Sequence, residues 1–420
     1  MNRLLFILLF LLLAGGVYAQ QPTNMLTLKE AEQRFLERNL SLIAERYNVD
    51  IAQAQILQAK LFDNPVISLE QNVYNRLNGK YFDFGEQGEA AIEIEQVIQI
   101  AGQRNKQVRL EKINKEIAEY QFEEVMRTLR QELKEKYVEV YFLTRTVAIY
   151  EKEVASLESL IAGMRQQQEK GNISLMEMSR LESMLFSLKK EKNERENELL
   201  TNRGELNILL NLPGDAQLPL QMDEEVLKQL DLTTFSFADM KAMITERPDQ
   251  KIARTTVNAS QANLKLQKSL AFPEFSIKGN YDRAGNFIDN YFAVGVSLSV
   301  PIFNRNQGNI KAARLSIQQA GVERESAANR ADMELFAAYT ILEKAVQLYQ
   351  TTNMDLERNF EKLIAGANEN FSKRNISLLE FIDYYDSYKE TCIQLHEIKK
   401  NVFLAIEHLN TTVGQNIVNY

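Results

Sequence analysis

The sequence has few of the residues that build catalytic and metal sites. Its 420 residues include one cysteine, two histidines and no tryptophan. His396 and His408 are too far apart for a ligand pair at i and i+4, so we expect both on helix surfaces. There is no phosphate-binding glycine loop and no nucleophile elbow. We therefore expect no enzymatic activity, no cofactor and no bound metal. Cys392 lacks a partner for an internal disulfide, and its place on an apolar helical seam predicts a core residue.

An excess of positive charge is absent as well. The formal net charge is −8, and no basic stripe runs along the chain. A nucleic-acid partner is therefore not expected.

Long hydrophobic runs are confined to the N-terminus. Arg3, the apolar run 4–14 and Val17-Tyr18-Ala19 form a secretory signal, which predicts a signal peptide over residues 1–19. The run is too short to span a bilayer, and no later segment reaches 18 apolar residues. No cysteine follows the cleavage site, so a lipid-anchored N-terminus is not indicated.

Proline is scarce and unevenly placed, which leaves room for long helices. None occurs between Pro65 and Pro213, or after Pro301. Apolar residues there recur at steps of three and four, as in Val140, Leu143, Val147 and Tyr150, and again from Leu335 to Leu363. A heptad pattern of this length predicts coiled-coil packing. A helix from 103 to 170 would be roughly 100 Å long at about 1.5 Å per residue.

The chain repeats itself. The phrase Asn172-Ile173-Ser174-Leu175 with Glu177 returns as Asn375-Ile376-Ser377-Leu378 with Glu380. Both are capping boxes, which predicts hairpin tips at Gly171–Asn172–Ile173–Ser174 and Arg374–Asn375–Ile376–Ser377. We expect a first repeat over 20–214, a linker over 215–236, a second repeat over 237–414 and a tail over 415–420.

Four segments alternate between apolar and polar residues and are predicted to be strands, at 66–74, 90–98, 274–282 and 291–301. Each has the length of a strand that crosses a bilayer obliquely, and aromatic residues gather near the intervening loops. A small soluble sheet with one wet face is the alternative. A membrane sheet cannot keep open edges, and four strands cannot close a barrel, so several chains would have to pool their strands. The polar residues would then line the lumen: Glu93, Glu95, Ser276, Lys278, Asn280, Ser297 and Ser299.

Taken together, the chain resembles the TolC-like outer-membrane factor family. The resemblance rests on the repeat, the strand–strand–long-helix order, the tip phrases and the stretch Val300-Pro301-Ile302-Phe303-Asn304-Arg305-Asn306-Gln307-Gly308-Asn309. The form Asn304-Arg305-Asn306-Gln307-Gly308, with Gly102-Gln103-Arg104 in the first copy, is similar to the heavy-metal (cobalt–zinc–cadmium) efflux subgroup. Two departures stand out. Arg374 replaces Gly171, so the second tip is not expected to need a left-handed backbone, and Gln96-Val97-Ile98 lacks the proline found at Pro301.

The resemblance implies a mainly α fold with a small β part. Long antiparallel coiled-coil hairpins and four strands per chain would assemble as a homotrimer, with a 12-stranded barrel continuous with an α-helical tunnel. It implies a place in the outer membrane of a Gram-negative bacterium, in contact with its lipid and extending into the periplasm. The tips would dock on a periplasmic adaptor (membrane fusion) protein and, through it, on an inner-membrane RND-type pump.

The resemblance also implies an acidic ring at the periplasmic mouth, formed by Glu380 and Asp383. Such a ring favours cations. Glu380 has a second explanation as the capping-box acid, and Glu177 is expected to be a cap only. Arg180 stands in the first copy where Asp383 stands in the second. The methionines near the first tip are expected to pack in the core rather than bind soft metals: Met164, Met176, Met178 and Met184.

Three functions remain open. The chain is an outer-membrane exit duct of an efflux pump for heavy-metal cations or drugs, a duct for type I protein secretion, or a periplasmic coiled-coil scaffold without a pore. The sequence does not identify the cargo.

Overall fold

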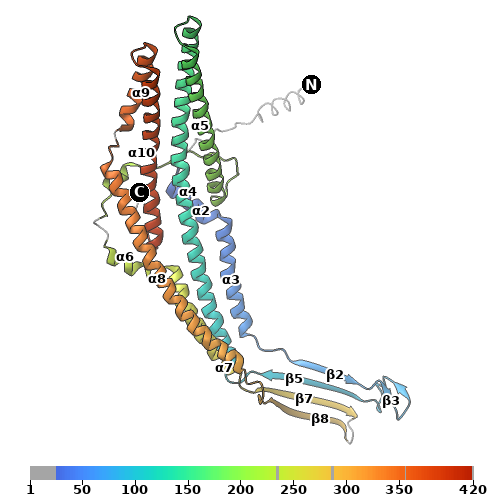
Figure 1. Ribbon diagram of the computed structural model, residues 1–420. Coiled ribbons are helices and arrows are strands. Elements are labelled where there is room, and N and C mark those ends of the chain that lie inside the picture. The colour runs from blue at the N-terminus through green and yellow to red at the C-terminus, as the bar shows by residue number, and fades with distance from the viewer. Residues whose placement is uncertain (1–24, 233–235, 285–287, 355, 419–420) are drawn as a thin grey trace, which may run out of the picture.

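The computed structural model describes residues 25–232, 236–284, 288–354 and 356–418. The expected signal peptide at 1–19 lies outside the described residues. The molecule is long and narrow, with helices along its axis, a sheet at one end and two helical tips at the other (Figure 1). No helix in the described ranges is long and apolar enough to cross a membrane.

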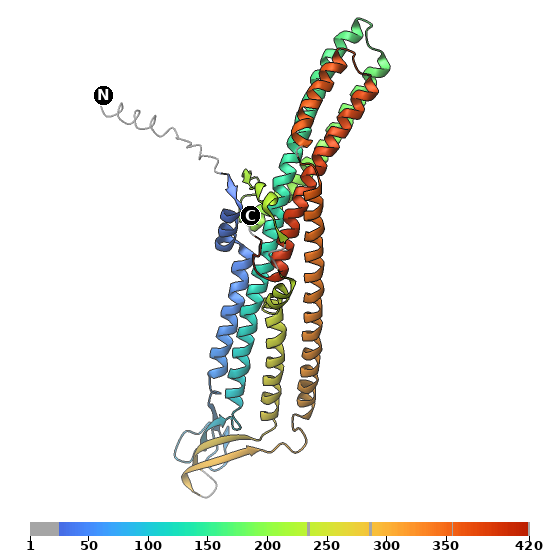
Figure 2. The ribbon, with the colours of Figure 1, turned by 90° about the vertical axis from the view of Figure 1, so that its left-hand side faces the viewer.

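The first hairpin is built on one unbroken helix. Helix α4 (Gln103–Glu169) has 67 residues, about 100 Å at the usual rise. Helix α5 (Leu175–Leu209) returns beside its upper half, and α3 (Leu40–Lys60) packs beside its lower half, preceded by the short α2 (Leu28–Arg38). Figure 2 shows α4 running from the sheet to the tip.

The second hairpin is in more pieces. Helix α8 (Gln307–Thr351) stops short of the tip, and α9 (Leu356–Ser372) continues upward. Helix α10 (Leu378–Val413) returns, and α6 (Phe237–Ile244) and α7 (Pro248–Ser269) complete the copy.

The break between α8 and α9 corrects the sequence prediction, because the apolar seam from Leu335 to Leu363 reads as one helix. The hydroxyls of Thr351 and Thr352 donate to the carbonyls of Gln347 and Leu348 at 2.8 and 2.7 Å. Such back-bonding by β-branched residues weakens a helix, and Thr352 leaves it with an extended ψ of 136°. The apolar pattern indicates which residues are buried. It does not indicate that threonine hydroxyls bind the backbone carbonyls of the helix.

In each copy the C-terminal end of the return helix, α5 or α10, meets the start of a helix that leads to the sheet, α3 or α7. Asn39 caps α3 by accepting from Leu42 N at 2.9 Å and donates to Leu209 O of α5 at 2.9 Å. In the second copy the N-cap residue of α7, Arg247, donates to Thr412 O of α10 at 3.1 Å.

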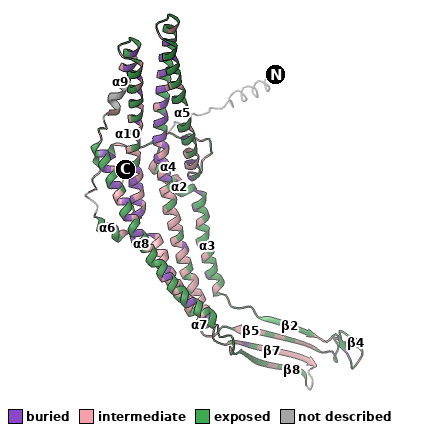
Figure 3. Cartoon of the chain, viewed as in Figure 1, coloured by how far each residue is buried: buried purple, intermediate pink, exposed green. Residues whose placement is uncertain are grey.

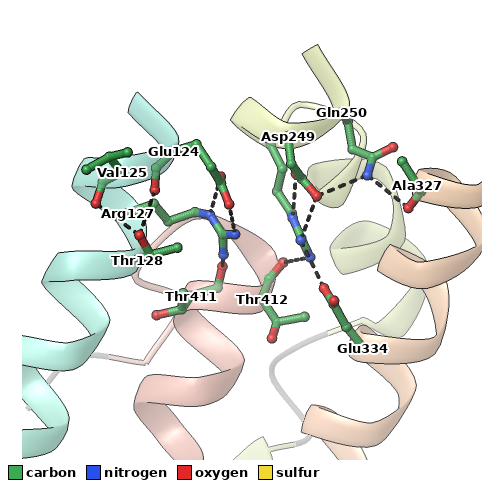
Figure 4. A network of polar contacts seen from close by, with 11 residues as sticks. Glu124, Val125, Arg127, Thr128, Asp249, Gln250, Ala327, Glu334, Thr411 and Thr412 are labelled. Atoms are coloured by element: carbon green, nitrogen blue, oxygen red, sulfur yellow. Dashed lines mark hydrogen bonds and ion pairs between the residues drawn. The ribbon is translucent and has the colours of Figure 1, made fainter. Parts of the chain in front are cut away.

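Ion pairs and hydrogen bonds of arginine stabilise the joint between α7 and α10 (Figure 4). Arg247 also binds Asp249 at 2.8 Å and Glu334 at 2.9 Å, and Arg127 of α4 donates to Thr411 O at 2.8 Å. Two guanidinium groups thus contact the C-terminal carbonyls of α10, where the helix dipole favours cations.

The core runs along the upper and middle helices, whereas the edge strands of the sheet and the outer helix faces are mostly exposed (Figure 3). Cys392 is 1% exposed, which confirms its predicted core position. The prediction that His396 lies on a helix surface was wrong, because its side chain is buried. The centroid of its ring lies 6.2 Å from that of Phe142. Helix α10 packs on α4 and α8 as well as α9, so its buried stripe is wider than a simple seam. His408 is half-buried.

The sheet has four antiparallel strands in the order β2-β5-β7-β8: Val66–Gln71, Ala90–Ile98, Glu274–Ala284 and Asp289–Ser299. The first is shorter than the predicted 66–74, because the chain bends after Gln71. The last begins and ends two residues earlier than predicted. The pairing of β5 with β7 joins the two copies, and the helices that adjoin the sheet follow the matching order α3, α4, α7, α8.

Short elements complete the fold. Strands β3 (Tyr74–Asn75) and β4 (Lys80–Tyr81) form a ribbon in the loop beyond β2. Strands β1 (Leu26–Thr27) and β6 (Leu220–Gln221) pair in parallel near the middle, followed by the 3₁₀ helix η1 (Glu225–Gln229).

The two tips share one backbone geometry, which corrects the expectation for Arg374. Gly171 has φ +74° and Arg374 has φ +62°, so both are left-handed. Asn172 N donates to Gln167 O at 2.9 Å, and Asn375 N donates to Asn370 O at 2.8 Å. Both are the long bond of a Schellman motif, and it imposes the left-handed residue whatever its side chain.

Replacing Arg374 with glycine should therefore stabilise the second tip by about 1 kcal/mol, because a left-handed backbone costs a non-glycine residue roughly 1–2 kcal/mol. Gly171→Arg should cost the first tip a similar amount, since no atom lies within 4 Å of a Cβ placed there. Hydrogen exchange at the amides of Asn172 and Asn375 measures both effects. Unchanged protection in both variants would contradict the assignment of strain.

Candidate functional site

One face of the sheet carries a cluster of charge. Lys278 Nζ lies 3.1 Å from Glu93 Oε1 and 3.1 Å from Glu95 Oε2. Ser276 donates from its hydroxyl to Glu95 Oε1 at 2.6 Å. The lysine on β7 is thus held between two glutamates on β5, which leaves the cluster with one net negative charge per chain.

The register places the other predicted lumen residues on that same face. Residues directly opposite each other in an antiparallel pair share a face. Asn280 lies opposite Glu93, Ser297 opposite Ser276 and Ser299 opposite Glu274. All seven residues predicted to line a lumen therefore lie together on one face of the sheet.

The other face is apolar and uncovered. Val294 is 84% exposed and Val296 71% exposed, and Leu69 of β2 is 76% exposed. Ile67, Ile94, Ile277, Phe292 and Leu298 extend the surface across all four strands. A band of this kind in water would be a strong association surface, and it has the alternation of a strand that meets lipid.

The sheet also has two open edges. Strands β2 and β8 each pair on one side only among the described strands. Unpaired N–H and C=O groups along an edge pair readily with another strand.

At the far end, both tips are closed by capping boxes. Ser174 and Glu177 exchange hydrogen bonds of 2.9 and 3.2 Å, and Ser377 and Glu380 exchange bonds of 2.8 and 3.2 Å. Backbone and hydroxyl hydrogen bonds from the serines hold the pKa of both glutamates below the usual value. Because these pKa values are lowered, the caps contribute stability at neutral pH and lose it as the pH falls through the lowered pKa.

The two predicted mouth acids differ in their surroundings. The Glu380 carboxylate is engaged by Ser377, whereas Asp383, one turn further along α10, is exposed beside the exposed Tyr384. Arg180, at the equivalent place on α5, is exposed too. The tips present Leu175, Met176 and Leu379 to the surface at 73, 81 and 65% exposure.

The methionines divide between core and surface. Met164 and Met178 are buried and Met184 packs against the core, whereas Met176 is exposed. Within the described part of the chain, no cluster of three His, Cys, Asp or Glu side chains is placed to hold a metal ion.

The phrase that carried the resemblance has a structural role that the sequence reasoning missed. Asn306 is the N-cap residue of α8, with a left-handed φ of +57°, and its side-chain amide donates to Gln267 O at 2.8 Å. Gln103 begins α4 and donates to Ser269 O at 2.9 Å. Both amides fix the lower end of α7, where the helices meet the sheet. The position of each amide just after a strand was a signal in the sequence. Its hydrogen-bond partner on α7 could not be identified, because it lies far away in the sequence.

Comparisons with known proteins match this geometry. The family model described as outer membrane efflux protein matches residues 32–212. A comparison with curated proteins finds no match.

Three solved structures share the fold. CusC is 18% identical with a TM-score of 0.74, and the match covers 92% of each chain. The CmeC outer membrane channel of Campylobacter jejuni is 15% identical with a TM-score of 0.75, covering 93% of this chain and 87% of that one. The open-state MtrE outer membrane channel of Neisseria gonorrhoeae is 16% identical with a TM-score of 0.71, covering 93% and 89%. The chain thus has the mainly helical fold of outer-membrane channels and an efflux-family match over residues 32–212.

Proposed function

We propose that this chain is the outer-membrane channel of a tripartite efflux pump and acts as a passive exit duct. The observation that carries the proposal is the sheet, which has one uncovered apolar face, one charged face and two open edges. Such a sheet is stable when lipid covers one face, a wet lumen meets the other and further strands close the edges.

A homotrimer satisfies these conditions. Two chains would give eight strands, and side chains fill the interior of a barrel of that size. Three chains give twelve strands and leave room for a channel. The edge strands β2 and β8 of neighbouring chains would pair.

The helices favour the same assembly. Helix α3 exposes Leu40, Tyr47 and Ile51 at 56–64%, and α8 exposes Val322, Met333 and Phe336 at 66–74%. These two helices are the outer members of the lower helical layer, and they adjoin the edge strands β2 and β8 in sequence. Packing α3 of one chain on α8 of the next would bury both stripes and continue the barrel as a helical tunnel.

The direction of the chain supports the proposed partners. With the sheet in the outer membrane of a Gram-negative bacterium, the helices extend about 100 Å into the periplasm. The tips, with exposed Leu175, Met176 and Leu379, would then meet a periplasmic adaptor and, through it, an inner-membrane RND-type pump.

Heavy-metal cations or drugs are the proposed cargo. The resemblance of residues 304–308 to the heavy-metal subgroup supports cations. The net negative charge on the polar face of the sheet and the exposed Asp383 favour cations too. A type I protein-secretion duct would have the same outline, so the cargo needs a separate test.

The membrane position is tested with two neighbouring substitutions on β8. Val296→Arg places a charge on the apolar face and should cost about 2–4 kcal/mol of membrane-inserted stability per chain. Ser297→Arg, on the polar face, is the matched control and should be tolerated. The readout is the amount of trimer recovered from outer-membrane fractions. Equal recovery of both variants would contradict membrane insertion, and a detergent-free soluble monomer would indicate a periplasmic scaffold.

The mouth assignment is tested by neutralising its acids. Asp383→Asn should lower the cation-over-anion permeability ratio several-fold in planar bilayers, because it removes one charge per chain from the constriction. Glu380→Gln removes a charge but keeps the capping box, since glutamine also serves at that position. Unchanged selectivity in the double variant would remove the gate assignment.

The cargo is tested in a deletion strain. Loss of the gene should raise sensitivity to zinc, cobalt or copper salts or to common antibiotics, and the wild-type gene should restore resistance. Unchanged sensitivity, together with loss of a secreted protein from the medium, would favour type I secretion.

A further inference from the structure

Glu153 is a buried carboxyl group with no obvious structural role. It lies on α4, in the upper half of the first hairpin, and is 3% exposed. Neither of its carboxyl oxygens has a hydrogen-bond partner among the described residues. A buried carboxylate without a donor is costly, so the group favours its neutral form.

The one cation near Glu153 among the described residues, Lys389, is shared with other acids. From α5 it faces Glu191, and from α10 it faces Tyr385, Asp386 and Lys389. Lys389 Nζ lies 2.9 Å from Glu191 and 3.8 Å from Asp386, so these acids already share the lysine.

The nearby hydroxyls are engaged elsewhere as well. Tyr150, on α4, donates to Glu191 at 3.3 Å. Tyr385 donates to the backbone oxygen of Glu153 at 2.8 Å, and not to its carboxyl group. Two further acids and a shared lysine therefore surround a carboxyl group that has no donor.

This carboxyl group lies where the two hairpins meet. The Tyr385 bond links α10 to α4, and Asn368 of α9 donates to Ser156 of α4 at 3.0 Å. Next to these contacts, between α4 and α9, is a cavity lined by both polar and apolar residues, among them Ser156, Leu160, Met164, Asn368 and Glu369. Ser156 lies one helical turn from Glu153 on α4. Separation of α9 and α10 from α4 would open this interface to water, which hydrates an ionised carboxylate.

We propose that Glu153 is a pH-sensitive switch that holds the two hairpins together when neutral and separates them when ionised. This inference concerns contacts within one chain and does not depend on the proposed duct.

The direction follows from linkage. Burial raises the pKa of Glu153 from 4.5 to about 8, Lys389 lowers it, and Glu191 and Asp386 raise it. Since the pKa is raised in the packed state, the contact is fully stable at low pH and weakens as the pH rises toward 8.

The test measures the distance between the hairpins as a function of pH. Spin labels are placed at Ala162→Cys and Ala365→Cys, two exposed positions on α4 and α9 beyond Glu153. Cys392 is buried and is left unlabelled. The labelled full-length chain is mixed with excess unlabelled chain, so that only distances within one chain are seen. We expect the short-distance population to decrease as the pH rises between the ordinary pKa of 4.5 and the raised pKa of about 8.

Two variants distinguish the switch from a purely structural contact. Glu153→Gln cannot ionise and should keep the short distance at every pH. Glu151→Gln, an exposed acid of the same helix, is the matched control and should titrate like the parent.

Two results would overturn the proposal. One is a parent distance that does not change from about pH 4.5 to about pH 9. The other is a Glu153→Gln variant whose distance changes with pH as the parent's does. An unchanged parent distance decides against the proposal even if Glu153→Gln does not fold.

Discussion

The open edges of the four-stranded sheet are the constraint on which the rest of the structure depends. Strands β2 and β8 each leave one side unpaired, and the apolar face of the sheet is uncovered. In lipid, every backbone polar group must find an internal partner, so a lone chain cannot be the membrane form. The long helices repeat this incompleteness, because the outer members of their layer also expose apolar stripes. Among the described residues, the sheet and the helices thus leave matching surfaces uncovered on the same sides of the chain.

The two copies reach one geometry through different residues. The left-handed tip residue is Gly171 in one copy and Arg374 in the other. The residue that binds the last carbonyls of the return helix is the neutral Asn39 in the first copy and the charged Arg247 in the second. In each pair the backbone contact is kept while the side-chain chemistry changes. Hydrogen bonds to the last carbonyls of a helix are therefore the shared requirement, and either an amide or a guanidinium meets it.

Much of this fold was predictable because its signals are local. Strict alternation placed the strands, the absence of proline between Pro65 and Pro213 allowed α4, and two capping boxes located the tips. What could not be predicted depends on residues far apart in the chain. His396 is buried because α10 contacts several helices, and Arg374 is left-handed because Asn375 must reach Asn370. The isolation of Glu153 appears only when α4, α5 and α10 are brought together. The proposed pore and docking roles involve further chains, so no local signal in one sequence encodes them fully.

The gap between α8 and α9 has a mechanical consequence. Helix α4 is a single rod from the sheet to its tip, so a force applied at that tip reaches the sheet end directly. Its counterpart is divided at Thr352, where the backbone becomes extended. A force applied at the second tip can bend the chain at this joint, so less of the displacement reaches the strands. One hairpin is therefore a continuous rod and the other a jointed one, although the two share the sequence Asn-Ile-Ser-Leu at their tips.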